Sequence, residues 1–344
     1  MSRYDADFYR EHGDTARRSA RVVVPMLARW LQPASVVDVG CGTGAWLAVF
    51  REQGITDLLG IDGEWLDAGA LEIPPHCFLR RELSQPVRLD RHFDLVMSLE
   101  VAEHLPKEDA DTFVESLVSL GRVILFSAAI PEQGGRHHVN EQWPEYWAQR
   151  FARHGYLPLD FLRPRIWNDP GVAWYYAQNL LLFVRQDHLA SMPALPPPGV
   201  SETPLPLVHP RLYHAKLSEL RTWIERTDGL AGDLSRVVPP GASVIMVDQG
   251  ALGRLASAGY RVSPFPEEDG RYAGPPADDD SALREFERLR DRGAQFMIFA
   301  WPAFWWMDHY RGLARELRTA FPVVLENARA IVFDLRGYSR GAPR

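Results

Sequence analysis

The sequence predicts an α/β protein with a doubly wound parallel sheet in its N-terminal half and a second, smaller α/β domain behind it. Three observations predict this class. Apolar segments of strand length alternate with amphipathic segments of helix length, which is typical of parallel sheets. The run Ser35-Val-Val-Asp-Val-Gly-Cys-Gly-Thr-Gly44 joins a buried strand to a glycine-rich turn. A proline-rich stretch at 191–210 separates the two halves, and such a stretch indicates a linker.

The first domain is expected to alternate helices and strands from its beginning. A helix is predicted over 14–31, with Asp14 as its N-cap and apolar residues at helical spacing. The strand and glycine turn follow, and a helix is expected from Ala45 to Phe50. Further along, strands are predicted at 58–61, 76–79, 93–99, 122–127, 156–161 and 179–185, and helices at 109–120 and 144–154.

The second half of the chain begins with the linker at 191–210, which holds seven prolines. A helix near 212–226 carries an apolar stripe of Leu217, Leu220 and Ile224. Packing of this stripe against one of the domains is favoured over a dimer helix. Beyond it, strands are predicted at 243–248, 295–300, 323–325 and 330–335, and helices at 252–259, 281–292 and 305–319. We therefore divide the chain into 1–190, a connecting segment 191–235, and 236–344.

Composition limits the classes of partner. The formal net charge is −7, so no nucleic-acid partner is expected. Two cysteines, Cys41 and Cys77, form no disulfide framework. No apolar run reaches the roughly 18 residues of a membrane span, and the first residues lack a secretion segment. We expect a cytoplasmic protein that does not contact membranes, and the oligomeric state is not predicted.

The glycine turn predicts a site for a nucleoside-like cofactor. Gly40 and Gly42 let the backbone turn sharply and approach a ligand without a Cβ between them. Asp62 lies 22 residues after Gly40, at the end of the second predicted strand, where an acid bonds ribose hydroxyls. This spacing fits NAD as well as S-adenosylmethionine.

A pair of motifs distinguishes these two cofactors. Asp38, Gly40, Gly42 and Gly44 read DxGxGxG, and Phe93-Asp-Leu-Val-Met-Ser-Leu-Glu-Val-Ala-Glu-His-Leu105 follows. Together they resemble class I S-adenosylmethionine-dependent methyltransferases over residues 1–185. The resemblance implies a Rossmann-like sheet that ends in a reversed hairpin. It implies these cofactor-binding residues: Asp38, Val39, Gly40, Cys41, Gly42 and Gly44 around the methionine chain, Asp62 and Gly63 at the ribose, Glu82 and Leu83 with Val39 at the adenine, and Glu100 near the positive end of the donor.

The run Glu100-Val-Ala-Glu-His104 predicts a metal site. If it forms a helix after the strand, Glu100, Glu103 and His104 share one face. The same spacing resembles that of ubiquinone-pathway O-methyltransferases and that of small-RNA 2′-O-methyltransferases, in which these residues bind metal. His138 or His137 would be the fourth ligand. Mixed oxygen and nitrogen ligands suit Mg²⁺ or Mn²⁺, and Zn²⁺ is a further possibility. Alternatively, Glu103 and His104 only cap a helix.

A polar loop after the strand at 122–127 is a candidate for the acceptor site. His138 is the expected general base, with His104 and Glu141 as further catalytic residues. The acceptor-binding candidates are His137, Asn140 and Gln142 in this loop, Trp174, Tyr175, Gln178 and Asn179 before the last strand, and Tyr9 in an N-terminal lid.

These observations predict a methyltransferase whose acceptor is a hydroxyl of a sugar or glycosylated metabolite. The acceptor class comes from the similarity of this arrangement to methyltransferases of polysaccharide and secondary-metabolite clusters. Two alternatives stay open: a non-catalytic scaffold that docks a partner through its C-terminal domain, and a nicotinamide-dependent oxidoreductase. The C-terminal domain resembles a degenerate Rossmann-like module of bacterial glycan-biosynthesis proteins. Its aromatic cluster at 301–310 is either a core corner or a platform for a sugar.

Overall fold

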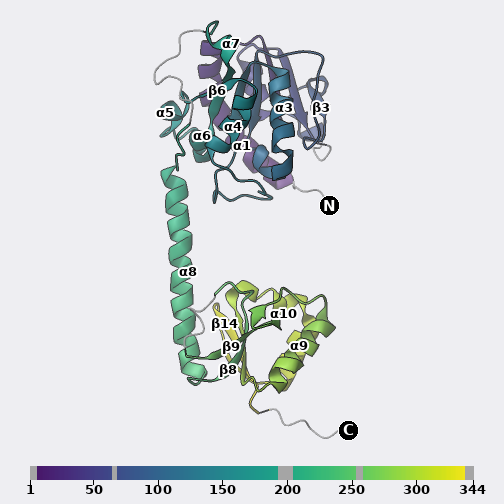
Figure 1. Ribbon diagram of the computed structural model, residues 1–344, viewed down its shortest axis with the longest axis vertical. Helices are drawn as coiled ribbons and strands as arrows, with labels where there is room; N and C mark the ends of the chain where they lie inside the picture. Colours follow the sequence, from purple (N-terminus) through teal and green to yellow (C-terminus); the bar gives the residue numbers. More distant parts are fainter. Residues whose placement is uncertain (1–5, 64–67, 193–203, 253–258, 338–344) are drawn as a thin grey trace. The chain divides into compact units, whose positions relative to one another are not determined.

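The computed structural model describes residues 6–63, 68–192, 204–252 and 259–337, without the side chains of 6–12 and 68. The chain divides into two compact units, Met1–His214 and Ala215–Arg344, and each is described by itself (Figure 1). None of the described helices is long and apolar enough to cross a lipid bilayer.

The first unit contains a seven-stranded sheet in the order β3-β2-β1-β4-β5-β7-β6. The first five strands are parallel, whereas β7 runs antiparallel to both β5 and β6. This confirms the predicted doubly wound sheet and the hairpin at its end. The strands are β1 (Ser35–Val39), β2 (Asp57–Asp62), β3 (Phe78–Arg80), β4 (Leu95–Leu99), β5 (Val123–Ser127), β6 (Tyr156–Leu159) and β7 (Leu181–Arg185).

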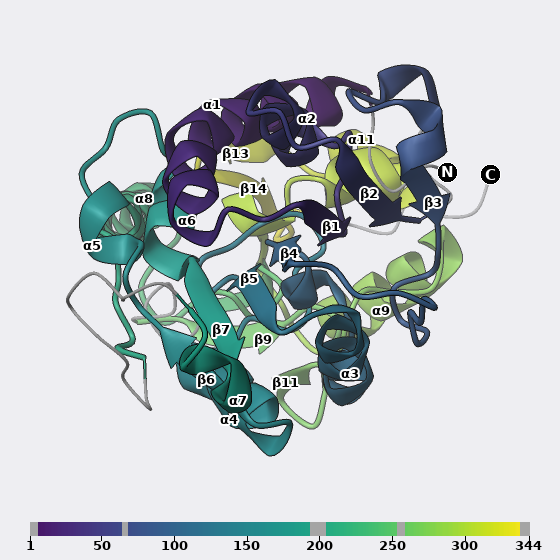
Figure 2. The same ribbon diagram turned by 90° about the horizontal axis from the view of Figure 1, so that it is seen from above.

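Helices cover both faces of this sheet because neighbouring strand residues point to opposite sides. Val36 of β1 belongs to one apolar core and Val37 to the other. The first core includes residues of α1, α2 and α6, and the second includes residues of α3 and α4; Figure 2 shows the two groups on opposite sides of the strands. The helices are α1 (Ala6–Leu31), α2 (Ala45–Glu52), α3 (Ala110–Leu120), α4 (Pro144–Arg153), α5 (Arg163–Ile166), α6 (Trp174–Asn179) and α7 (Gln186–Leu189).

Several predicted boundaries in the first unit are wrong, among them those of the first helix and the third strand. The first helix begins by Ala6, so Asp14 lies inside it and is not its N-cap. The third strand begins at Phe78, because Pro75–Cys77 forms a 3₁₀ turn that starts with a proline. Proline supplies no backbone N–H to a sheet ladder, so it favours the turn.

The second unit is built on a five-stranded sheet in the order β13-β14-β12-β8-β9, with a separate β10–β11 pair. Strands β12, β8 and β9 are parallel, and β14 runs antiparallel to β12 and β13, as the predicted hairpin requires. The strands are β8 (Ser243–Val247), β9 (Arg261–Pro264), β10 (Glu267–Glu268), β11 (Arg271–Tyr272), β12 (Phe296–Ala300), β13 (Val323–Glu326) and β14 (Ala330–Asp334). The structure thus has a second sheet in the C-terminal part of the chain, as the sequence predicts.

The helices of this unit differ from the predictions in two places. The first, α8 (Pro210–Val237), begins in the last residues of the first unit and is longer than expected. Leu220 and Ile224 of its stripe are exposed. The helix predicted at 305–319 is two helices that break at Tyr310, because the Asp279 carboxylate accepts the N–H groups of Gly312 and Leu313 and caps the second one. The remaining helices are α9 (Asp279–Asp291), α10 (Trp306–His309) and α11 (Arg311–Ala320). The helix predicted at 252–259 lies largely outside the described residues.

Candidate active site

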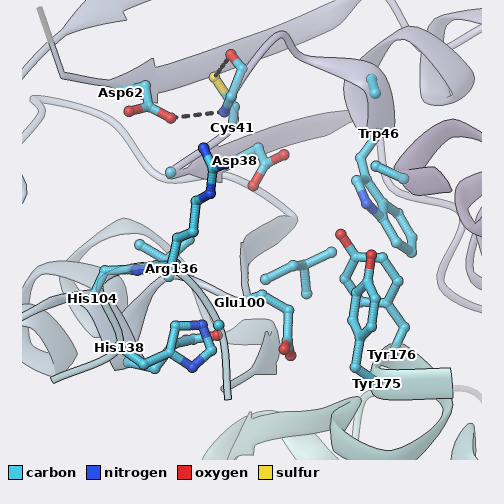
Figure 3. Close-up of a pocket in the computed structure, with 18 of the residues that line it drawn as sticks. Asp38, Cys41, Trp46, Asp62, Glu100, His104, Arg136, His138, Tyr175 and Tyr176 are labelled. Atoms are coloured by element: carbon cyan, nitrogen blue, oxygen red, sulfur yellow. Dashed lines mark hydrogen bonds between the residues drawn. The ribbon is translucent and has the colours of Figure 1, made fainter. Parts of the chain in front are cut away.

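A cavity of about 460 Å³ opens at the carboxyl ends of β1, β2 and β4 in the first unit (Figure 3). Strand β1 pairs in parallel with β2 on one side and with β4 on the other, so the order of the strands reverses here. Open α/β sheets bind ligands at such a point. The sequence-predicted residues that line the cavity are Asp38, Gly40, Cys41, Gly42, Asp62, Glu82, Leu83, Glu100, Glu103, His104, His138, Trp174 and Tyr175.

The glycine turn after β1 forms one wall of the cavity. Gly40 and Gly42 have left-handed φ angles of 84° and 53°, which favour glycine. A Cβ on Gly40 would lie 2.4 Å from Val101 Cγ2, whereas a Cβ on Gly42 would meet nothing within 4 Å. Gly40 is therefore required for packing, and Gly42 leaves open space toward the cavity.

The Asp62 carboxylate connects the end of β2 to this turn. Its Oδ2 accepts the N–H of Gly42 at 2.7 Å, and its Oδ1 accepts the N–H of Gly63 at 2.7 Å. Burial raises the pKa of Asp62, and the two backbone hydrogen bonds counteract that rise. The Gly40 N–H also donates to the Ile61 carbonyl at 2.7 Å, so the turn is held against β2.

Asp38 is the second buried carboxylate of this wall. Its side chain is 2% exposed, and Oδ1 has no hydrogen-bond partner among the described residues. Burial, and then the charge of Asp62, raises its pKa to about 8. A buried oxygen without a partner destabilises the fold, and a ligand that donates a hydrogen bond would satisfy it.

Glu100 does not lie in a helix, which corrects the predicted arrangement of the Glu100–His104 run. It has a left-handed φ of 55°, and a short 3₁₀ turn, Ala102–His104, follows it. Its N–H donates to the carbonyl and the hydroxyl of Ser127 at 3.0 and 3.1 Å. Its carboxylate accepts from Gln133 Nε2 at 2.9 Å and from Asn179 Nδ2 at 3.1 Å. Long-range contacts, and not helical spacing, therefore orient Glu100.

Three side chains come together in metal-binding geometry beside it. One ligand atom each from Glu103, His104 and His138 lies within 4.8 Å of the others, and Glu100 is not in this group. Glu103 is fully buried, and neither carboxylate oxygen has a hydrogen-bond partner among the described residues. The two imidazole rings are 4.9 Å apart and nearly perpendicular.

Physical causes shift two pKa values in this cluster. Burial, and then the charge of Glu100, holds the pKa of Glu103 well above its usual range. Burial, and then the neighbouring His138, lowers the pKa of His104 to about 4. His104 is therefore neutral near pH 7, and one ring nitrogen has a lone pair that could coordinate a cation.

The loop between β5 and α4 brings His138 to the cavity. Its Nδ1 lies 2.8 Å from Glu141 Oε1, which also accepts the N–H of Gly134 at 2.7 Å. A Cβ on Gly135 would lie 2.2 Å from His138 Nε2, so glycine is needed where the ring packs. The N–H groups of Val139 and Asn140 donate to the Glu103 carbonyl at 2.8 and 3.0 Å, which fixes the loop to the turn after β4.

Several predicted site residues do not line the cavity. Val39 is buried in the apolar core, and Asn140 Oδ1 accepts from Gln142 Nε2 at 3.0 Å. Gln178 and Asn179 are buried behind Glu100. The full set outside the lining is Val39, Gly44, Gly63, His137, Asn140, Glu141, Gln142, Gln178 and Asn179. Tyr9 lies in α1, and its side chain is outside the described part.

Sequence reasoning missed several lining residues. Gly13 and Ala16 come from α1 and occupy one helix face three residues apart, a pattern of small residues that allows close approach to a ligand. Trp46 and Tyr176 stack edge to face at 5.2 Å. Figure 3 shows the Arg136 side chain among these residues. The remaining members of this set are Thr43, Ala45, Leu99, Val101, Leu105, Gln133, Gly134 and Gly135.

Comparisons with known proteins show what the first unit is similar to. A family model described as a methyltransferase domain matches residues 9–166, a little under half of the chain. This match includes the glycine turn and the first six strands. A search of curated proteins gives no match.

Among solved structures, magnesium protoporphyrin IX methyltransferase of Synechocystis with bound SAH is 20% identical, with a TM-score of 0.37 over 49% of this chain and 83% of that one. DesVI of Streptomyces venezuelae is 16% identical, with a TM-score of 0.40 over 52% and 95% of the two chains. A putative O-methyltransferase of Nostoc punctiforme is 10% identical, with a TM-score of 0.39 over 52% and 59%.

The raised pKa of Asp38 predicts how stability depends on pH. The unfolded chain loses this proton near pH 3.8, whereas the folded chain keeps it up to about pH 8. The contribution of Asp38 to the free energy of unfolding therefore falls as pH rises through this window. Asp38→Asn removes the titration, so this variant should melt at a higher temperature than the wild type at pH 8. The difference in melting temperature between the two should be several degrees larger at pH 8 than at pH 5. In the control Asp90→Asn, which changes an exposed residue, the difference from the wild type should not increase with pH. An equal difference at pH 5 and pH 8 for Asp38→Asn would contradict this account.

Proposed function

We propose that the first unit is an S-adenosylmethionine-dependent methyltransferase that methylates a hydroxyl group of a sugar or glycosylated metabolite. One observation carries the proposal. Gly42, Asp38 and Asp62 line the same cavity, and a Cβ on Gly42 would meet nothing within 4 Å. All three residues lie in a segment that matches a methyltransferase domain. Space for a ligand and two side chains that accept hydrogen bonds thus occur together at one turn.

The chemistry of these residues fits the methyl donor. The donor carries a primary ammonium and a sulfonium, whose positive charges attract carboxylates, and ribose hydroxyls, which donate hydrogen bonds to them. The partnerless Oδ1 of Asp38 supports a hydrogen bond from the methionine chain. Asp62 has room to accept from the ribose hydroxyls, because each carboxylate oxygen takes more than one hydrogen bond. Glu82 and Leu83 line the cavity beyond it, which supports a role at the adenine.

The acceptor side needs a group that removes a proton. When bound, the donor supplies a methyl group already activated by its positive sulfur. His138 lines the same cavity, and Glu141 at its Nδ1 would keep the proton on that nitrogen and leave Nε2 to accept one from the hydroxyl. Trp174 and Tyr175 contribute aromatic surface on the α6 side, which suits the apolar face of a sugar.

A divalent cation would assist at the cluster of Glu103, His104 and His138. The two partnerless oxygens of Glu103 and the adjacent imidazoles are a donor set that suits Mn²⁺ or Mg²⁺, and also Zn²⁺. Such a cation would lower the pKa of the acceptor hydroxyl and fix its position. In this form of the proposal, His138 is a ligand and not the base.

The donor site is tested by calorimetry with S-adenosylhomocysteine. We expect binding, and at least about tenfold weaker binding in Gly42→Asn, because the new side chain enters the cavity while asparagine tolerates a left-handed backbone. Gly54 is the matched control, since it has a φ of 89° with nothing within 4 Å and does not line the cavity. Gly54→Asn should bind normally. Binding of NAD without S-adenosylhomocysteine would favour an oxidoreductase, and donor binding without turnover on any acceptor would favour a scaffold.

The metal site is tested by chelation and by a substitution of similar size. EDTA should lower methyl transfer, and Mn²⁺ should raise the melting temperature of the wild type. Glu103→Gln removes the carboxylate charge, so it should be as slow as the chelated enzyme and show no Mn²⁺ shift. Full activity in EDTA, together with no thermal shift, would remove the metal from the proposal.

The role of His138 is tested in His138→Ala. We expect a fall in turnover of about 10²–10⁴-fold, with S-adenosylhomocysteine affinity nearly unchanged. His137→Ala is the control, because that exposed neighbour does not line the cavity. An unchanged turnover in His138→Ala would exclude this residue from catalysis, whether as base or as metal ligand.

A further inference from the structure

The last part of the predicted linker, immediately before α8, is held on the first unit by buried contacts. We call residues 204–209 the strap. The Leu205 carbonyl accepts from Nη1 of the fully buried Arg163 at 3.0 Å. At the other end, His209 is buried, its N–H donates to Gln178 Oε1 at 2.8 Å, and its ring lies 4.8 Å from that of Trp167. The strap is therefore seated immediately before the chain enters α8 at Pro210.

Gln178 receives the strap at a fully buried position. Its Oε1 accepts the His209 N–H, and its Nε2 donates to Gln133 Oε1 at 3.0 Å and to Asn179 Oδ1 at 2.9 Å. The two N–H groups of Nε2 donate to these two neighbouring oxygens. If the amide were rotated by 180°, its NH₂ group would instead face the N–H of His209, and two donors would oppose each other. The strap and the two neighbouring amides thus fix one orientation of Gln178.

The same network continues to the cavity. Gln133 Nε2 donates to Glu100 Oε2 at 2.9 Å, and Asn179 Nδ2 donates to Glu100 Oε1 at 3.1 Å. Asn179 Nδ2 also donates to Gln133 Oε1 at 2.9 Å. Glu100 and Gln133 both line the cavity, whereas Gln178 does not. A continuous set of hydrogen bonds therefore joins the Glu100 carboxylate to the backbone of the strap.

We propose that Gln178 is a positioning residue that couples binding of the methyl donor at Glu100 to seating of the strap. This inference rests on the proposed function. With the strap seated, Gln178 holds Gln133 and Asn179 in the orientation that presents the Glu100 carboxylate to the cationic donor. Without the His209 N–H, Gln178 Oε1 has no hydrogen-bond donor, and the side-chain amides of Gln178, Gln133 and Asn179 can reorient. The coupling is reciprocal, because a ligand that favours one arrangement is itself favoured by it.

Hydrogen exchange of the full chain, with and without saturating S-adenosylhomocysteine, tests this coupling. In the wild type we expect the ligand to slow exchange at residues 40–44 in the cavity and, by about fivefold or more, at the strap. In Gln178→Met, which has a similar shape and no hydrogen-bonding amide, the strap should exchange quickly with or without ligand. Residues 40–44 should still be protected, and ligand affinity should fall about tenfold.

Gln295 provides a matched control, because its Oε1 also accepts a backbone N–H, that of Ser243 at 3.1 Å, in the second unit. Gln295→Met should leave the response of the strap to ligand intact. A wild-type strap whose exchange ignores the ligand while residues 40–44 are protected would overturn the coupling and leave the proposed function in place. A response retained in Gln178→Met would overturn the role of Gln178. No protection at residues 40–44 would contradict the donor site itself, and the coupling with it.

Discussion

The hydrogen bonds that Asp62 accepts from Gly42 and Gly63 are the constraint on which the site depends. They bring the end of β2 and the turn after β1 together, and the parallel pairing of these strands places that junction at one edge of the sheet. Gly42 lines the cavity with a left-handed backbone, and a Cβ at this position would meet nothing within 4 Å. The β1–β2 pairing, the glycine turn and the acidic residue are therefore parts of one arrangement.

The fold was predictable where one local pattern dominates. Val36 and Val37 lie in a run of β-formers that ends at a glycine turn, and alternation of such runs with helices is enough to predict the sheet. The arrangement of Glu100 was not predictable, because its backbone is set by Ser127, a partner 27 residues away. The lining contributed by Arg136 and Gln133 was missed for a related reason: a loop has no periodicity, and only the tertiary structure shows which of its side chains face the cavity.

Buried carboxylates distinguish this cavity from the rest of the first unit. Asp38 and Glu103 both have oxygens without hydrogen-bond partners among the described residues, which is unfavourable for stability. Glu100 is half-buried, and the side-chain amides of Gln133 and Asn179 donate to its carboxylate. The unsatisfied groups therefore lie at the two places where the proposed function puts a cationic donor and a metal. Natural sites commonly retain such unfavourable groups because a ligand compensates for them.

The central claim is that the methyl donor lies across the turn after β1, with its ribose at Asp62. A crystal structure of the chain with S-adenosylhomocysteine tests this most directly. We predict ligand density along the open side of Gly42, with ribose hydroxyl oxygens within about 3 Å of the Asp62 carboxylate. An empty turn at saturating ligand, or a ligand bound elsewhere on the chain, would contradict the account.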